Sequence, residues 1–175
     1  LYQGDVGYFW KMKPTLSREI SVPQPFILNT NSEGFRDDER SSNLKTVLLL
    51  GCSTTLGWGV NREETFEFLL DSAHPDVTFI NGGQPGWSSH QIAMNGSEFS
   101  NWEPSVVLVG VGVRDAQVSN RQDALATPTP WLLRRYSVRW LQSLLNRDGT
   151  NSSKSGDTVR VPAASFGSNL EKIAD

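Results

Sequence analysis

The sequence is poor in the residues that form covalent cross-links and transition-metal sites. Cys52 is the only cysteine among 175 residues, which excludes an internal disulfide framework. Two histidines and one cysteine also supply few of the ligands that zinc prefers. We therefore expect neither a metal nor an organic cofactor.

Long apolar runs and long runs of one charge are also missing. No apolar run reaches the roughly 18 to 20 residues that span a bilayer, so we expect a soluble domain. The net charge is -3 with acidic and basic residues interspersed, which gives no electrostatic footprint for nucleic acid and favours a small or neutral partner. The chain starts at Leu1 without a signal-peptide pattern, and an extracytoplasmic location is compatible with that start.

From Lys45 onward, short apolar runs alternate with amphipathic segments. The apolar runs, which are typical of strands buried on both faces, cover residues 46–51, 77–81 and 105–113. Helical patterns cover residues 61–73, 89–102, 131–146 and 162–175. This alternation predicts an α/β fold, a flavodoxin-like three-layer α/β/α sandwich around a parallel sheet.

Residues 1–44 follow a different pattern. Residues 1–25 mix aromatic side chains with Pro and Gly and show no sustained period, which indicates an extended arm. Residues 26–36 alternate around an Asn-Ser-Glu-Gly turn and predict a short hairpin. We therefore expect an arm and hairpin over 1–44, packed on a domain over 45–175, and we expect the C-terminal part of that domain to be absent from these residues.

The loops that follow the three predicted strands hold the candidate chemistry, because open α/β sheets bind ligands at the carboxyl ends of their strands. The first loop is Gly-Cys-Ser-Thr-Thr-Leu-Gly-Trp-Gly over 51–59. The second is Asn-Gly-Gly-Gln-Pro-Gly-Trp-Ser over 81–88, and the third ends in Arg114-Asp115. Serine at a strand tip, with glycines that let the backbone approach a substrate, favours nucleophilic catalysis.

The ordered set GCSTTLGWGV, NGGQPGWSS and GVRD resembles blocks I, II and III of the SGNH or GDSL hydrolases. The upstream segment NTNSEGFRDDE is similar to one often found before that core in bacterial members, and the last helix resembles the family's next element. The resemblance covers roughly residues 29 to 115. It implies the SGNH hydrolase fold and a serine esterase that acts on a small-molecule or carbohydrate ester, such as an O-acetyl group.

The resemblance also implies roles for individual residues. Ser53 is the nucleophile, and the oxyanion hole is formed by its backbone N–H, that of Gly86 and the block III side chain, here Arg114. The family's base is a histidine in an Asp-x-x-His block near the carboxyl end of the domain, and no histidine follows block III in this sequence. Cys52 and Arg114 replace the usual Asp of block I and Asn of block III, and the second exchange touches the oxyanion hole itself.

The residues alone leave other interpretations open. Cys52 is compatible with a nucleophile, although a small side chain that points into the core explains it better. Gly86 is compatible with a simple turn after Pro85. Asp115 is compatible with a pair with Arg114 or with capping of the following turn.

Three further residues near these loops are also open to two interpretations. His90 lies close to the second loop, but in the first turn of a predicted helix. Trp58 and Trp87 flank the first two loops and are compatible with a substrate cleft or with core packing. The loops match neither a P-loop nor a dinucleotide fingerprint. An O-acyltransferase and a non-catalytic SGNH-like binding module are the alternative functions.

Overall fold

A computed structural model describes residues 1–3, 10–21, 24–39, 44–119, 122–125 and 158–175. The helix predicted over 131–146 and the polar segment that follows it lie outside the described residues.

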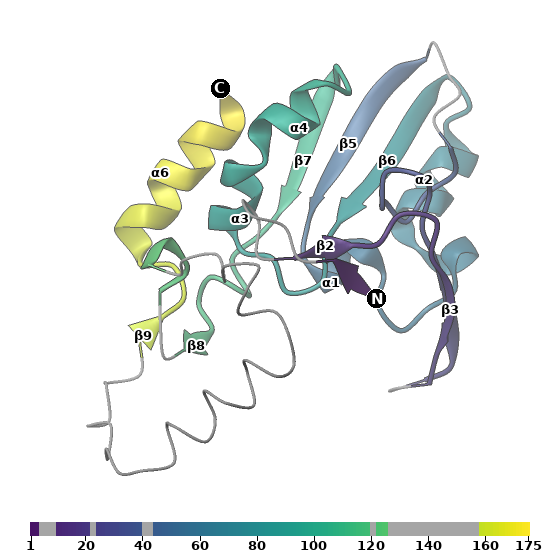
Figure 1. The fold of residues 1–175 in the computed structure, drawn as a ribbon. Coiled ribbons are helices and arrows are strands. Elements are labelled where there is room, and N and C mark those ends of the chain that lie inside the picture. Colours follow the sequence, from purple (N-terminus) through teal and green to yellow (C-terminus); the bar gives the residue numbers. More distant parts are fainter. Residues whose placement is uncertain (4–9, 22–23, 40–43, 120–121, 126–157) are drawn as a thin grey trace.

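A parallel sheet of three strands forms the centre of the molecule (Figure 1). β5 (Lys45–Gly51) lies between β6 (Val77–Gly83) and β7 (Val106–Gly110). This order corresponds to the first three strands of a flavodoxin-like sheet. The predicted α/β class and parallel sheet are therefore confirmed. β7 is shorter than the predicted strand over 105–113, because pairing with β5 ends at Gly110.

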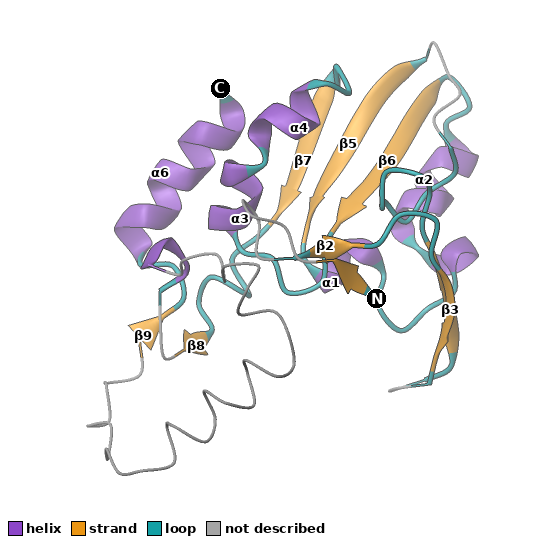
Figure 2. Ribbon diagram, in the orientation of Figure 1, coloured by secondary structure: helices purple, strands orange, loops and turns teal. Residues whose placement is uncertain are grey.

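The helices follow the strands in the predicted alternation (Figure 2). They are α1 (Ser53–Leu56), the 3-10 turn η1 (Arg62–Glu64), α2 (Phe66–Ala73), α3 (Ser89–Met94), α4 (Gly96–Ser100) and α6 (Ala163–Ala174). The single helix predicted over 89–102 was wrong. It is interrupted at Asn95, whose side-chain amide donates to the Gln91 carbonyl at 2.7 Å.

The main core lies between the sheet and the helices α3 and α4. Leu48 and Leu50 project from one face of β5, as the alternation of a strand requires, and are at most 2% exposed. They join a cluster whose other buried members are Phe35, Ile80, Trp87, Ile92, Phe99 and Trp102. The part of this sheet face on β5 is therefore well covered, whereas Val107 of β7, in register with Leu48, is 37% exposed.

The opposite face of β7 is only partly covered. Val106 and Leu108 are paired in register with Val47 and Leu49, but each is 48% exposed. The prediction of a strand buried on both faces was therefore wrong for β7. The apolar composition of this strand exceeds what the described residues bury.

The N-terminal residues form two short antiparallel pairs. β1 (Tyr2–Gln3) pairs with β2 (Lys11–Met12), and β3 (Ser17–Ile20) pairs with β4 (Phe26–Asn29). The hairpin predicted within residues 26–36 was wrong, because β4 pairs with the preceding strand. Met12, Phe26 and Leu28 form a second buried cluster with Leu56 of α1, which joins these strands to the α/β core.

A third antiparallel pair, β8 (Val118–Ser119) with β9 (Thr158–Val159), leads into α6. The 3-10 turn η2 (Asp123–Leu125) lies between these strands in the sequence. Among the described helices, none is long and apolar enough to cross a membrane.

Candidate active site

Three glycines at the ends of the three parallel strands allow α1 to lie directly on the sheet. Gly51 is in register with Gly83 on one side and with Gly110 on the other. A Cβ at Gly83 would lie 2.3 Å from the Leu56 nitrogen, and one at Gly110 would lie 2.9 Å from the Thr55 hydroxyl. Since no side chain fits there, glycine at these positions lets Ser53 begin a helix immediately above the strand tips.

The loop that follows Ser53 is held by a buried arginine. Gly57 ends α1 in a left-handed conformation (φ 78°), and the Trp58 N–H donates to the Ser53 carbonyl at 2.9 Å. The Arg36 guanidinium is fully buried and donates to the carbonyls of Gly57 and Val60, at 2.6 Å each. Burial lowers the pKa of Arg36, and these carbonyls accept charge-assisted hydrogen bonds from its two terminal nitrogens.

The second loop is held by hydrogen bonds with residues that lie near the beginning and near the end of the sequence. The Trp10 indole N–H donates to the Pro85 carbonyl at 2.9 Å, and the Trp87 indole N–H donates to the Trp10 carbonyl at 2.9 Å. Arg160 donates to the Gly86 carbonyl at 2.9 Å. Gly86 itself has a φ of 81°, a conformation that favours glycine.

The third loop contains one buried and one more exposed member of the predicted pair. Asp115 is 3% exposed, and its carboxylate accepts the N–H groups of Ser89 at 2.8 Å and Gly112 at 2.9 Å. Arg114 instead donates to the Gln117 side chain at 3.1 Å. These contacts correspond to neither interpretation of Asp115, because its carboxylate caps α3 and the preceding part of its own loop rather than the following turn.

Three of the four predicted site residues line one pocket of about 280 Å³. Ser53, Gly86 and Arg114 each come from a different strand-end loop. Asp115 does not line this pocket. Its carboxylate instead accepts the N–H of Gly112 within the third loop. The other lining residues are Tyr2, Trp58 and Pro85. The structure thus brings the candidate nucleophile, a candidate oxyanion donor and a cation together.

Sequence reasoning did not identify Tyr2, Trp10 and Arg160 as part of this site. Tyr2 lines the pocket, whereas the other two hold its second loop. All three come from segments far from the loops in sequence. No local pattern in the sequence signals such contacts.

The two tryptophans that flank the loops have different positions. Trp58 lines the pocket, as one of its two interpretations requires. Trp87 is 3% exposed and belongs to the core cluster. Cys52 is also buried, at 6% exposure, which agrees with the interpretation of a small core side chain.

Neither histidine lines the Ser53 pocket. His90 lies in the first turn of α3, and burial is the main cause that lowers its pKa, against the opposing effect of the Asp123 carboxylate. His74 ends α2, and its ring lies 6.0 Å from that of Phe79. Among the described residues, no side chain hydrogen-bonds the Ser53 hydroxyl, and no group of three or more His, Cys, Asp or Glu is arranged to hold a metal ion.

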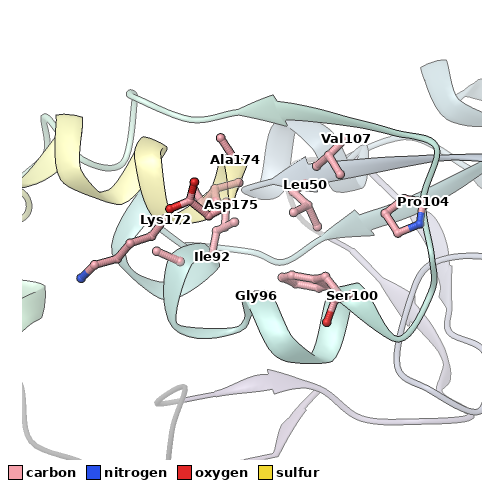
Figure 3. A pocket seen from close by; sticks show the side chains of 12 residues that line it. Leu50, Ile92, Gly96, Ser100, Pro104, Val107, Lys172, Ala174 and Asp175 are labelled. Atoms are coloured by element: carbon pink, nitrogen blue, oxygen red, sulfur yellow. The ribbon is translucent and has the colours of Figure 1, made fainter.

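A larger cavity, of about 620 Å³, lies between the sheet and the helices α3, α4 and α6. Figure 3 shows Leu50 and Val107 of the sheet together with Ile92 of α3 and Ala174 of α6 around it. Its lining is mainly apolar, and among the described residues that line it Ser100 carries the only hydroxyl side chain. It contains none of the predicted site residues.

A large pKa shift is also found away from the Ser53 pocket. Glu67 of α2 is 1% exposed, and burial raises its pKa to about 8, with a further contribution from the Asp37 carboxylate. One carboxyl oxygen of Glu67 has no hydrogen-bond partner among the described residues. A buried acid with a raised pKa can mark a functional site, but Glu67 does not line a pocket with Ser53.

Comparisons with known proteins give weak similarities. No protein-family model matches the chain, and no curated protein matches it. Among solved structures, the SGNH-hydrolase family esterase AlinE4 aligns at 19% identity over 44% of each chain, with a TM-score of 0.39. Two single-residue mutants of that esterase align at 17% identity over 77% of this chain. One is covered over 69% of its own length with a TM-score of 0.39, and the other over 73% with a TM-score of 0.40.

The segment aligned to the first of these structures thus spans less than half of the esterase. Structural neighbours of this chain therefore include SGNH-hydrolase family esterases.

Proposed function

We propose that this chain carries the nucleophile and the oxyanion hole of a serine ester hydrolase of the SGNH type, acting on a small acyl ester. The observation that carries the proposal is that one pocket is lined by Ser53, Gly86 and Arg114. These residues come from three separate loops, each at the carboxyl end of a parallel strand. This is the edge of an α/β sheet where ligands bind.

The reaction follows from the chemistry of these groups. The Ser53 hydroxyl oxygen attacks the ester carbonyl carbon and gives its proton to a base, which leaves a tetrahedral oxyanion. The N–H groups of Ser53 and Gly86, with the Arg114 guanidinium, stabilise that charge. Collapse of the intermediate expels the alcohol, which takes the proton, and water then releases the acid from acyl-Ser53.

The proposal requires a base that accepts the Ser53 proton. Neither His74 nor His90 lines the pocket. The resemblance to SGNH hydrolases places this role in an Asp-x-x-His block near the carboxyl end of the domain, and no histidine follows His90 in the sequence. The Asp-x-x-His formed by Asp71 and His74 ends α2 and does not line this pocket. General-base catalysis contributes typically 10²- to 10⁴-fold. Residues 1–175 alone should therefore turn over p-nitrophenyl acetate no faster than their Ser53→Ala variant.

The protein as its gene encodes it should react with a fluorophosphonate probe at Ser53, because an activated serine attacks this electrophile quickly. Ser53→Ala should abolish both labelling and hydrolysis. Ser100→Ala is the matched control, since Ser100 lines the larger cavity, and it should change neither. An adduct on another serine, or esterase activity that survives Ser53→Ala, would refute the assignment.

A non-catalytic binding module is the second candidate, and it is favoured by Cys52 and Arg114, which stand where the family has Asp and Asn. An O-acyltransferase differs from the hydrolase only in the acceptor that meets acyl-Ser53. A binding module would retain ester affinity in Ser53→Ala and show no labelling in the wild type. A transferase would form the fluorophosphonate adduct but require an added alcohol, such as a sugar, for fast turnover.

A further inference from the structure

We propose that Trp10 and Arg160 are positioning residues, which together fix the direction of the Gly86 N–H toward the Ser53 pocket. This inference rests on the proposed function, because it assigns that N–H to the oxyanion hole. Neither residue lines the pocket. Both act through the backbone of the second loop.

Trp10 acts on the peptide unit that contains the Gly86 N–H. This unit consists of the Pro85 carbonyl and the Gly86 N–H, and in a planar trans peptide the two groups point in opposite directions. The indole N–H of Trp10 donates to the Pro85 carbonyl at 2.9 Å. Fixing the carbonyl on one side therefore fixes the N–H on the other. A donor at the carbonyl also polarises the N–H of the same unit.

The Trp10 indole is itself held in place. Its backbone carbonyl accepts the indole N–H of Trp87 at 2.9 Å, and Trp87 is a buried member of the core. The Trp10 ring also packs on Gly86, since a Cβ at this glycine would lie 3.2 Å from the ring atom Cζ2. The two tryptophans thus connect the second loop to the core.

Arg160 fixes the next peptide unit. Its guanidinium donates to the Gly86 carbonyl at 2.9 Å, so that both peptide units that flank the Gly86 Cα have a partner. The same guanidinium makes two hydrogen bonds to Asp123, at 3.1 and 2.9 Å, and one to Gln91 at 3.2 Å. Arg160 and Asp123 are 12% and 13% exposed, so this pair is well shielded from water.

Gly86 needs such support more than other residues would. Glycine loses more conformational freedom on folding than any other residue, and a positive φ is readily exchanged for a negative one. An oxyanion donor stabilises the transition state only if it is already oriented before the reaction. The hydrogen bonds from Trp10 and Arg160 therefore restrict the backbone conformation of Gly86, which glycine alone does not restrict.

Anchoring of the N-terminal arm is not by itself the role of Trp10, because other contacts serve that purpose. The Met12 N–H donates to the Gln84 side chain at 2.9 Å, and Lys11 pairs with Glu98 at 2.8 Å. Lys11→Met is therefore a matched control. It removes a contact of the arm next to Trp10 but leaves the Pro85–Gly86 peptide unit untouched.

The kinetic test uses Trp10→Phe, which keeps an aromatic ring but removes the donor, and Arg160→Lys, which keeps the charge but cannot make the forked contacts. With p-nitrophenyl acetate, each variant of the protein as encoded should lose about tenfold in kcat with little change in KM, less than the 10²- to 10³-fold for loss of an oxyanion donor. The inhibition constant of trifluoroacetone, which forms an oxyanion on Ser53, should rise by the same factor. Lys11→Met should change neither value. A kcat of Trp10→Phe equal to that of the wild type, or an equal loss in Lys11→Met, would overturn the proposal.

A second measurement separates this proposal from the proposed function. The amide ¹⁵N chemical shift of Gly86 depends on hydrogen bonding to the Pro85 carbonyl and can be recorded without any activity. It should change in Trp10→Phe and stay constant in Lys11→Met. A changed Gly86 shift in a protein without Ser53-dependent activity would refute the esterase and retain the role of Trp10 in orienting this peptide. An unchanged shift would refute that role whether or not the protein hydrolyses esters.

Discussion

The second and third strand-end loops line the same pocket but differ in how they are held. In the second, the carbonyls of Pro85 and Gly86 each accept a hydrogen bond from a distant side chain. In the third, Val113 is 78% exposed, and a Cβ at Gly112 would meet nothing within 4 Å. Among the described residues, no distant side chain donates a hydrogen bond to residues 110–114, and the loop is held through Asp115, whose carboxylate accepts the N–H groups of Ser89 and Gly112.

This difference separates two tasks within the proposed site. A donor to the oxyanion must be oriented in advance, and Gly86 lies on the tightly held side. A side chain that selects among substrates benefits from the freedom to adapt, and Arg114 lies on the open side. The following predictions test this division.

Gly86→Ala should have the largest effect. The new Cβ would lie 3.2 Å from the Trp10 ring at a φ of 81°, so the loop must shift and the N–H must turn away from the oxyanion. We expect a loss of 10²- to 10³-fold in kcat, as for removal of an oxyanion donor. Steady-state kinetics on a small acyl ester measure it.

Gly112→Ala is the matched control for that variant. Its φ of 112° is as unfavourable for alanine, but the side chain would meet open space. Strain of this kind costs roughly 1 to 3 kcal/mol of stability, with a smaller loss of kcat than in Gly86→Ala. Equal losses of kcat in both variants would contradict the distinction between a fixed and an open loop.

Glu67→Gln should remove a pH dependence of the free energy of unfolding. This dependence would otherwise obscure the comparison of the stabilities of loop variants. The pKa of Glu67 is about 8 in the folded protein against a usual value of 4.5, chiefly because of burial. Its contribution to stability is therefore greatest below pH 4.5, falls as the pH rises to about 8, and is level above that value.

The neutral amide of Glu67→Gln avoids this penalty, so the variant should gain on the order of a few kcal/mol at pH 8 relative to the wild type. The gain should vanish near pH 4. Urea unfolding at both pH values measures it. A gain that is equal at the two pH values would mean that folding does not raise the pKa of Glu67.

Asp115→Asn should loosen the third loop where it is anchored. The Asp115 carboxylate accepts from the N–H groups of Ser89 and Gly112, and an amide presents one oxygen and one donor to these two donors. We expect a loss of roughly 1 to 3 kcal/mol in the free energy of unfolding. Gly86 amide exchange should stay constant while that of Gly112 accelerates, and acceleration of both would show that the loops are coupled.

Arg114→Asn should have the smallest effect, and its sign depends on the substrate. A guanidinium that lines the pocket can bind a carboxylate or phosphate on the substrate as well as the oxyanion. We expect the wild type to prefer an ester with an anionic group by up to about tenfold, or 1.4 kcal/mol, and Arg114→Asn to lose that preference. A uniform gain on neutral and anionic esters would instead show that Arg114 impairs the oxyanion hole.

The sheet could be predicted from the sequence because its signals are local. The run over 46–51 is apolar throughout and matches the buried strand β5. The interruption of the helix at Asn95 was missed, since helical periodicity continues across it. The pairing of β3 with β4 was missed because Ser17–Ile20 is polar and mostly exposed, and short exposed strands carry little periodicity.

Some residues of the candidate site could likewise be predicted from the sequence, and others could not. Ser53, Gly86 and Arg114 lie at strand ends, and the topology of a parallel sheet brings such positions together. Trp10 and Arg160 could not be predicted, since their contacts with the second loop depend on tertiary packing rather than on a local pattern.

The long-range contacts of Gly86 also bear on the order in which the molecule folds. Trp10 is 75 residues before its partner Pro85, and Arg160 is 74 residues after Gly86. Contacts at such separation require the closure of long loops and form after local structure. During synthesis, the sheet strands β5, β6 and β7 are all made before Arg160 leaves the ribosome. The pocket should therefore be the last part of the molecule to become ordered, and in mild denaturant it should lose function while the central sheet is still intact.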